Sequence, residues 1–253
     1  MILLNSILDI LKLSVLKLRH RLFLFFSKKS LFRDRLNKEG FIVIENFFST
    51  DELAQLKKNF VEIFQKEDSI TIKQNNDTRL FEYEKFDKFF NKKIRKKYES
   101  FLVKNLSITL RHSFSMANIM KANEKNAYGS GGGWHKDSPF SNQFKVFLFL
   151  ENVKKENGPL CFINKTHLFS SILKILLRSG VPIRKYRFSE EDIKKIKDIN
   201  FEESIFTLKA GTIIIANTQI IHRGAPIEMG KRLAITEYIF DKKEEKDLFL
   251  KNL

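Results

Sequence analysis

A histidine and an aspartate lie two residues apart in the segment Trp134-His135-Lys136-Asp137. In an extended segment, residues i and i+2 point to the same side, so both side chains can reach one metal ion. His222, which follows the apolar run 212–216, offers a third ligand. Two imidazoles and one carboxylate on one face of a metal leave three positions open, the arrangement of non-haem Fe(II) oxygenases. The pattern predicts a catalytic Fe(II) site with room for a bidentate co-substrate and O₂.

Taken alone, this spacing is a weak signal, because a His-x-Asp pair and a distant histidine occur together by chance in many chains. The sequence also contains His20, His112 and His167, and a buried histidine is more often a hydrogen-bonded structural residue than a ligand. The same ligand set holds catalytic Zn²⁺ in hydrolases. A non-catalytic binding protein, with or without membrane contact, is a further alternative on such a fold.

Arg232 begins an alternating run of side chains that follows His222. An arginine that faces the interior needs an anion, and its guanidinium binds a carboxylate through two parallel hydrogen bonds. A dicarboxylate that chelates the iron at one end and meets Arg232 at the other explains both features. The alternative is a surface arginine at a strand end. Period-two geometry places Arg232, Ala234, Thr236 and Tyr238 on one face, and Leu233, Ile235, Glu237 and Ile239 on the other.

Three segments, 131–137, 156–167 and 211–240, resemble the phytanoyl-CoA dioxygenase family of Fe(II)/2-oxoglutarate oxygenases. The similar motifs are Gly-Gly-Gly-Trp-His-Lys-Asp-Ser, Glu-Asn-Gly-Pro-Leu with the following Thr166-His167, and His-Arg-Gly before Arg232. With 40–60, which also resembles the family, coverage is most of residues 36–240. The resemblance implies a mainly β fold with flanking helices (α+β), a double-stranded β-helix of the jelly-roll, cupin-like type.

The resemblance also implies a reaction, in which 2-oxoglutarate and O₂ yield succinate and CO₂ while a substrate C–H bond is hydroxylated. His135, Asp137 and His222 would hold the Fe(II), and Arg232 would bind 2-oxoglutarate. Related halogenases replace the carboxylate ligand with a small residue, so Asp137 favours hydroxylation over halogenation.

Two departures from the family pattern concern the co-substrate contacts. Asn164-Lys165-Thr166-His167 stands where family members often have Pro-Gly-Ser-His, and Ala234 replaces a serine. We expect Thr236 to supply the missing hydroxyl on the face of Arg232. Arg79 or Asn118 is expected to assist at the other end of 2-oxoglutarate.

Local patterns place these residues in a domain at 36–245, preceded by an extension at 1–35. We expect a strand at 41–44, a helix opening at Ser49 or Thr50 with an apolar stripe, a loop at 67–78, and a helix at 86–101 whose charge run 92–97 is solvated. An insertion at 168–206, with a second helix capped by Ser189, is expected to form a lid. Turn residues at 129–133 separate further strands, expected at 107–116, 145–150, 160–163, 205–208, 212–216 and 232–240.

The composition is that of a packed globule, with 253 residues, 43% of them hydrophobic, and 26 Phe. The net charge of +16 comes with no nucleic-acid-binding motif, so no nucleic-acid partner is expected. Cys161, the single cysteine, permits no intramolecular disulfide and is expected in a buried strand. A reducing cytoplasm fits best.

The amino-terminal segment Met1 to Phe26 is rich in Leu, Ile and Phe but interrupted by charged residues. It therefore matches neither a transmembrane span nor a secretory signal. We expect an amphipathic helix with a basic side, which either lies on an anionic membrane surface through residues 1–28 or packs on the domain or a partner subunit. Its expected apolar stripe is Leu4, Ile7, Leu8, Leu11, Val15 and Leu18.

The substrate is expected to be a small, lipid-like or glycan-type molecule. Arg184, Lys185 and Arg187 in the insertion are either a site for a phosphate, carboxylate or sulfate group, or charges exposed to solvent.

Overall fold

The computed structural model describes residues 2–26, 29–66, 71–74, 76–122 and 133–252. The predicted turn at 129–133 lies outside these residues except for Gly133, as do positions 67–70 and 75 of the predicted loop. The rest of that loop contains two strands, because Ile72–Gln74 (β2) and Asp77–Phe81 (β3) pair with each other at one edge of a sheet.

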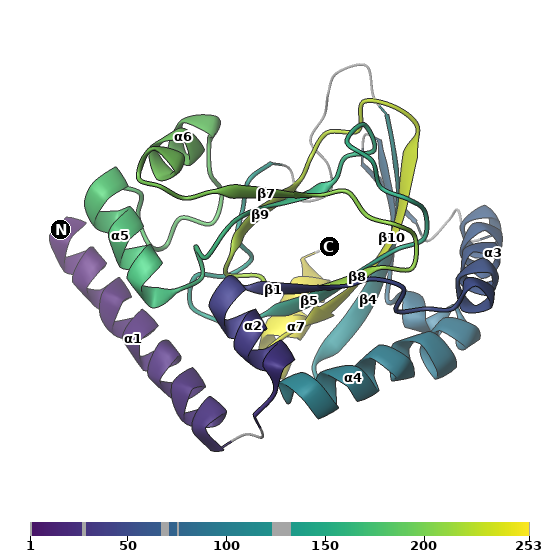
Figure 1. Cartoon of the computed structure of the whole chain (residues 1–253), viewed down its shortest axis with the longest axis horizontal. Coiled ribbons are helices and arrows are strands. Elements are labelled where there is room, and N and C mark those ends of the chain that lie inside the picture. The colour runs from purple at the N-terminus through teal and green to yellow at the C-terminus, as the bar shows by residue number, and fades with distance from the viewer. Residues whose placement is uncertain (1, 27–28, 67–70, 75, 123–132, 253) are drawn as a thin grey trace.

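Two antiparallel sheets form the centre of the described structure (Figure 1). The small sheet has the order β7 (Glu203–Phe206), β6 (Leu160–Ile163), β9 (Ile221–Gly224). The large sheet has the order β1 (Phe41–Ile44), β8 (Ile213–Asn217), β5 (Phe144–Phe149), β10 (Lys231–Ile239), β4 (Ser113–Lys121), β3, β2. The two sheets together confirm the predicted jelly-roll of two antiparallel sheets with flanking helices.

Helices cover the face of the large sheet that points away from the small sheet (Figure 1). They are α2 (Leu31–Glu39), α3 (Thr50–Lys66), the 3₁₀ turn η2 (Tyr83–Lys85), the π-helix η3 (Phe90–Arg95) and α4 (Lys96–Leu106). Leu56 and Leu102 of these helices are fully buried with Leu233 and Ile235 of β10. This cluster is the main hydrophobic core, and its burial orients β10.

Alternation along β10 follows the predicted pattern. Leu233, Ile235 and Ile239 belong to the core under the helices, whereas the alternate residues face the interior between the two sheets. There, Arg232, Ala234, Thr236 and Tyr238 line one small cavity.

The charge run at 92–97 is not a wholly solvated face, contrary to the prediction. Arg95 reaches the buried Glu237 of β10 at 2.7 Å, and Lys97 pairs with Glu52 at 2.6 Å. Tyr98 also donates a hydrogen bond of 2.7 Å to Glu237. A buried carboxylate needs such partners, and those of Glu237 are Arg95 from the charge run and Tyr98, which follows the run.

Several strand and helix boundaries differ from those predicted. The helical region continues to Leu106, so β4 begins only at Ser113, and β7 ends at Phe206. His222 lies within a strand, β9, and not directly after one.

The insertion packs on the outer side of the small sheet through α5 (Phe169–Ser179) and α6 (Glu190–Asp198). Ser189 caps α6 in a reciprocal capping box with Asp192, as predicted for this helix start. Trp134, Ile163 and Ile221 are buried against this layer. Cys161 is buried in β6, as predicted.

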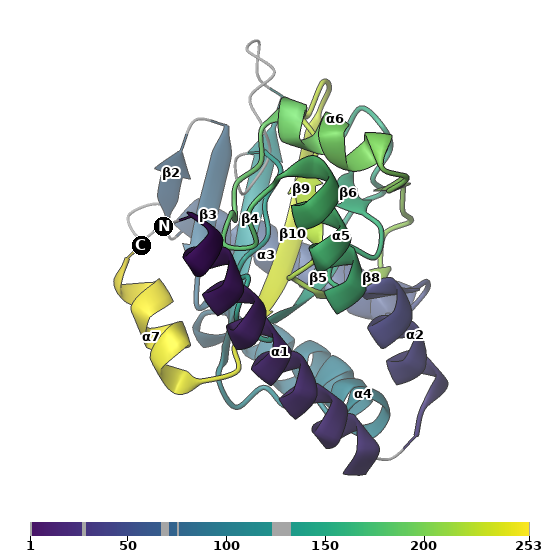
Figure 2. The same ribbon diagram turned by 90° about the vertical axis from the view of Figure 1, so that its left-hand side faces the viewer.

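Helix α1 (Ile2–Phe26) lies on the outside of the molecule beside α5 (Figure 2). It docks through Leu13 and Leu16, which are 0% and 7% exposed and pack with Ile172 and Ile183. The predicted stripe is not the docking face: its described members Ile7, Leu8, Leu11, Val15 and Leu18 are 45–62% exposed, and the side chain of Leu4 lies outside the described residues.

A terminal helix, α7 (Lys243–Lys251), was not predicted and lies at the other end of the chain. Phe249 and Leu250 pack it against Phe114 and Phe240. Of the helices described, none is long and apolar enough to cross a membrane. A cytoplasmic location stays a prediction.

Candidate metal centre and co-substrate pocket

His135 and His222 come together because their backbones pair. His135 N–H donates to His222 O at 2.8 Å, and His222 N–H donates to His135 O at 2.7 Å. On the other side, Arg187 forms a bridge with His135, and Asp137 N–H donates to Thr218 O at 3.0 Å. The segment around His135 is therefore fixed as an extra strand between β9 and the insertion. This explains how residues distant in the sequence meet at one point.

His135, Asp137 and His222 form a compact group in which one ligand atom from each lies within 4.8 Å of the others. His135 Nδ1 lies 2.9 Å from Gly133 O, and His222 Nδ1 lies 2.8 Å from Ile220 O. Because a carbonyl oxygen only accepts, both Nδ1 atoms carry the proton and both Nε2 atoms carry a lone pair. His222 Nε2 is buried without a hydrogen-bond partner among the described atoms. Backbone carbonyls that fix the tautomer in this way are typical of metal-bound histidines.

The protonation states also suit a divalent ion. Burial lowers the pKa of His135 to about 4 and that of His222 to about 3, so both rings are neutral near pH 7. Burial alone would raise the pKa of Asp137, but Lys145 and the two histidines outweigh it and hold that pKa below its ordinary value. Two neutral imidazoles and one carboxylate are therefore ready to bind a metal without losing protons.

Lys145 is a buried member of this site that the sequence analysis missed. Its Nζ lies 2.9 Å from Asp137 Oδ1 and 4.5 Å from the ring centroid of Tyr238. Lys145 stands on β5 at the same face as Phe147 and Phe149, with which it lines the cavity of the two histidines. The only signal was that Lys145 is the one charged residue of the predicted strand 145–150 and shares a face with Phe147 and Phe149.

Arg232 lies in the same cavity as the two histidines, a small space of about 60 Å³. It is 7% exposed, and burial lowers its pKa to about 10. Its guanidinium donates to Gly158 O and, at 3.1 Å, to Met120 Sδ, while Nε has no partner among the described atoms. No acidic side chain of the described residues forms an ion pair with it. A buried guanidinium without a carboxylate is costly, which is expected of a residue that receives its anion from a ligand.

Two glycines position this guanidinium. A Cβ on Gly224 would lie 3.2 Å from Arg232 Nη2. A Cβ on Gly158 would lie 2.6 Å from Ala225 O, and Gly158 also has a positive φ of 68°. The His-Arg-Gly and Asn-Gly-Pro motifs thus both position Arg232, one by leaving space and the other by presenting a carbonyl.

The three weaker co-substrate candidates differ in position. Thr236 and Asn118 line the cavity with Arg232. Asn118 Nδ2 donates to Asp77 Oδ1 at 2.9 Å, and Arg79 Nε donates to Asp77 Oδ2 at 2.6 Å. Arg79 is not among the described residues that line the cavity, so its contact with 2-oxoglutarate stays a prediction.

A second cavity, of about 430 Å³, reaches the metal site from the side of α7. Asp137 and Tyr238 border it, and Tyr238 is shared with the first cavity. Ser141 on its wall donates to Glu245 of α7 at 2.7 Å. No described residue of the insertion 168–206 lines this space. The lid role expected of the insertion stays a prediction, and α7 covers the space next to Asp137.

The profile of phytanoyl-CoA dioxygenase (PhyH) matches residues 36–231 of the chain, whereas none of the curated proteins matches it. Among solved structures, the non-haem α-ketoglutarate-dependent epimerase SnoN from nogalamycin biosynthesis has a TM-score of 0.62 at 10% identity, over 82% of this chain and 79% of that one. The carbocyclase SnoK from the same pathway has a TM-score of 0.59 at 12% identity, over 85% of both chains. EctD from S. alaskensis, solved with 2-oxoglutarate and 5-hydroxyectoine, has a TM-score of 0.61 at 18% identity, over 84% of this chain and 76% of that one.

At these identities the solved structures establish a shared fold, while the matched profile covers most of the chain. The family resemblance noted from the motifs is thereby confirmed, and iron and 2-oxoglutarate are the cofactors. The donor set fits them, because neutral imidazoles, an ionised carboxylate and a buried guanidinium share one site. The chain belongs to the phytanoyl-CoA dioxygenase family of Fe(II)- and 2-oxoglutarate-dependent oxygenases.

Proposed function

We propose that the protein hydroxylates a C–H bond of a small molecule that binds in the cavity beside Asp137. The observation that carries this proposal is the buried Arg232, which has no carboxylate partner and shares a cavity with His135 and His222. Hydrolysis at a Zn²⁺ site needs only water as second reactant, so it does not require an anion-binding group in the metal cavity. An enzyme that binds a dicarboxylate co-substrate does require one, and a guanidinium beside three metal ligands fits that need.

Each group in the site has a defined task in this proposal. His135, Asp137 and His222 hold the iron, which supplies oxygen activation coupled to decarboxylation of 2-oxoglutarate. Arg232 binds the distal carboxylate of 2-oxoglutarate through paired hydrogen bonds, and Thr236 adds a hydroxyl on the same face. Lys145 donates a hydrogen bond to the carboxylate of Asp137 and orients it. Asp137 itself occupies the ligand position that a halogenase would leave to chloride.

The cavity beside Asp137 indicates the class of substrate. Its described walls combine apolar side chains, such as Phe240 and Phe249, with polar ones, such as Gln143 and Glu245. Glu245 is the only acidic residue there besides Asp137, and no described lining residue is basic. We propose a substrate with hydroxyl or amine groups and an apolar portion, neutral or cationic.

The three basic residues of the insertion do not favour an anionic substrate. Arg184 donates two hydrogen bonds to Asp9, at 2.9 and 3.0 Å, and Lys185 pairs with Asp192 at 2.6 Å. The charges of Arg184 and Lys185 are therefore neutralised by acidic side chains of the protein itself. Neither they nor Arg187 is among the described residues that line the cavity.

The test is a screen of amines, polyols and lipid-like molecules with protein reconstituted anaerobically with Fe(II), read as substrate-dependent formation of succinate. The proposal expects turnover that requires both Fe(II) and 2-oxoglutarate, and that Asp137→Ala abolishes. Failure of 2-oxoglutarate to bind the Fe(II)-loaded protein would leave a non-catalytic binding protein as the better account.

The mass of the product separates hydroxylation from the reactions named for the structural relatives. Hydroxylation adds one oxygen atom, which ¹⁸O₂ labels. Epimerisation leaves the substrate mass unchanged, and oxidative ring closure removes two hydrogen atoms. An unlabelled product of either kind would be consistent with membership of the oxygenase family but would contradict the proposal of hydroxylation.

A further inference from the structure

Helix α1 presents two different faces, of which the domain uses only one. Its inner face is fixed by Leu13 and Leu16 in the apolar contact with α5 and by the ion pair of Asp9 with Arg184 at 2.9 Å. Farther along, Lys17 donates to Gln219, and His20 lies 3.2 Å from Asn37 Oδ1. Docking is therefore complete without the outer face.

The outer face carries a row of large apolar side chains exposed to solvent. A single exposed leucine needs no explanation, but a contiguous apolar row marks an interaction surface. From Ile7 to Phe25 the row runs about 27 Å, at the α-helical rise of about 1.5 Å per residue. We call it the outer stripe; it comprises Ile7 (46% exposed), Leu8 (45%), Leu11 (57%), Val15 (62%), Leu18 (59%), Leu22 (52%) and Phe25 (82%).

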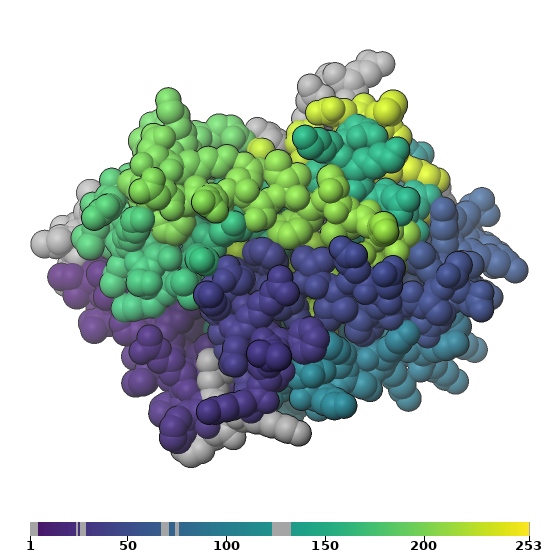
Figure 3. Space-filling model, in the orientation of Figure 1, coloured from purple at the N-terminus to yellow at the C-terminus, as the bar shows by residue number. Residues whose placement is uncertain are grey.

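The charges that flank the outer stripe are all positive. Lys12 and Arg19 follow one side of it and Arg21 the other, and all three are exposed. Asp9 is the one acidic residue between Ile2 and Phe26, and it is buried in its ion pair. In Figure 3 atoms of α1, in purple, lie at the surface at the lower left, below the insertion.

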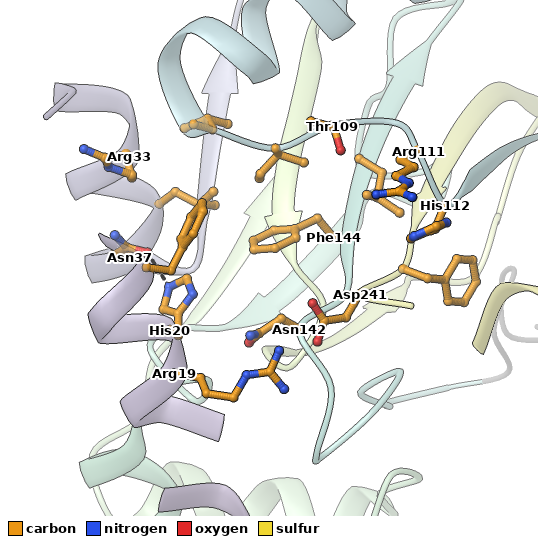
Figure 4. Close-up of a pocket in the computed structure, with 16 residues that line it drawn as sticks. Arg19, His20, Arg33, Asn37, Thr109, Arg111, His112, Asn142, Phe144 and Asp241 are labelled. Carbon is orange, nitrogen blue, oxygen red and sulfur yellow. Dashed lines mark hydrogen bonds between the residues drawn. The ribbon is translucent and has the colours of Figure 1, made fainter. Parts of the chain in front are cut away.

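A basic cavity adjoins the same edge of the helix. Arg19 and Phe23 belong to the wall of a space of about 370 Å³, together with Arg33 and Arg111. Figure 4 shows Arg19 entering it from α1 and Arg111 from the opposite side. Asp241 is the only acidic residue among the described lining residues. Positive charge thus extends from the helix onto the neighbouring surface.

We propose that α1 is a membrane-surface helix, which lies in the plane of an anionic bilayer with the outer stripe inserted among the lipids. An apolar face with basic flanks is the combination that binds interfacial helices to anionic lipids. A second copy of the chain is a poorer occupant, because stripe-to-stripe pairing brings Lys12, Arg19 and Arg21 of both copies together. A neutral bilayer leaves these cations without counter-charges. The inner face keeps the catalytic domain attached at the bilayer surface.

The test is flotation of the full chain with vesicles of phosphatidylcholine alone and of equal parts phosphatidylcholine and phosphatidylserine. The wild-type chain is expected to float with the anionic vesicles and to be released by high salt. In Leu11→Ser/Val15→Ser/Leu18→Ser, affinity is expected to fall on the order of a hundredfold or more, at roughly tenfold for each large apolar group lost from the bilayer.

Two matched variants complete the design. Val103→Ser/Ile205→Ser/Met229→Ser removes three apolar side chains of similar exposure, 48%, 53% and 62%, and is expected to bind like the wild type. Lys12→Gln/Arg19→Gln/Arg21→Gln is expected to lose the preference for anionic vesicles. Helicity by circular dichroism and binding of 2-oxoglutarate are expected to remain unchanged in all three variants.

Three results would overturn the proposal. The wild-type chain could fail to float with anionic vesicles, or the two triple serine variants could bind alike. Alternatively, the wild-type chain could sediment as a dimer that the outer-stripe variant dissociates, without vesicle binding, which would assign the stripe to a second copy of the chain.

Discussion

Two buried charges on β10 face opposite sides of the large sheet and have opposite surroundings. Glu237, on the helix side, receives hydrogen bonds from Arg95 at 2.7 Å and from Tyr98 at 2.7 Å. Arg232, on the inner side, has only a carbonyl and a thioether as acceptors. Glu237 is therefore a structural charge, whereas Arg232, which makes no ion pair among the described residues, is expected to receive its anion from a ligand.

His135 and His222 line the same cavity as Arg232, and the loss of a metal ligand gives the largest expected effect. His222→Ala should abolish turnover and weaken Fe(II) binding, because His222 Nε2 is buried with no hydrogen-bond partner among the described atoms and is available to the metal. Thermal stability should change little. Fe(II) titration with succinate detection measures the effect, and His112→Ala serves as the control. Turnover at the wild-type rate in His222→Ala would remove it from the metal centre.

Replacing Arg95 or Arg232 with methionine should change the free energy of unfolding in opposite directions. Arg95→Met leaves Glu237 buried with its ion pair broken, which costs about 3–5 kcal/mol. Arg232→Met removes an unpaired buried charge, and we expect the ligand-free protein to gain on the order of 1 kcal/mol. Urea denaturation of both variants without metal measures the sign of each change in unfolding free energy. Destabilisation of similar size in both would show that Arg232 is structural, like Arg95.

A smaller effect should follow from crowding Arg232 without changing it. A Cβ at position 224 would lie 3.2 Å from Arg232 Nη2, so Gly224→Ala should displace the guanidinium. At about 1 kcal/mol for mild overpacking, the requirement for 2-oxoglutarate should rise roughly fivefold. Steady-state kinetics at saturating Fe(II) measure this. Gly180→Ala, which is strained by its φ of 71° but has no atom within 4 Å of its Cβ, controls for a general loss of stability. A shift of the Fe(II) requirement in place of that for 2-oxoglutarate would contradict the assignment.

The sequence predicted correctly which side chains of β10 face the cavity and which face the core, because alternation along a strand is a local property. Alternation alone separates Arg232 and Thr236 from Leu233 and Ile235. The pattern could not show that Glu237 is paired, because Arg95 comes from a charge run that resembles a solvated helix face. Lys145 was also missed, since its partner Asp137 is brought to it by the fold.

The amino-terminal helix shows a different limit of sequence reasoning. Hydrophobic periodicity identified an apolar stripe, but periodicity does not say what covers it. The docking face is set by the distant partners Arg184 and Ile172, and by Asp9, one of the charged residues that interrupt the apolar segment. Strand β9 escaped prediction because Ile221–Gly224 contains a histidine, an arginine and a glycine and is not a run of β-prone apolar residues.

The most direct test of the account is calorimetric titration of 2-oxoglutarate into the Fe(II)-loaded protein without oxygen, comparing Arg232→Lys with Arg95→Lys. Lysine keeps the charge but loses the paired planar donors. For Arg232→Lys the account predicts a loss of roughly 1.5–3 kcal/mol, which is about a tenfold to hundredfold rise in Kd. The affinity of folded Arg95→Lys for 2-oxoglutarate should remain at the wild-type level. Fe(II) binding should be unchanged in both variants. Unchanged 2-oxoglutarate affinity in Arg232→Lys, or equal losses in the two variants, would contradict the assignment of Arg232 as the co-substrate anchor.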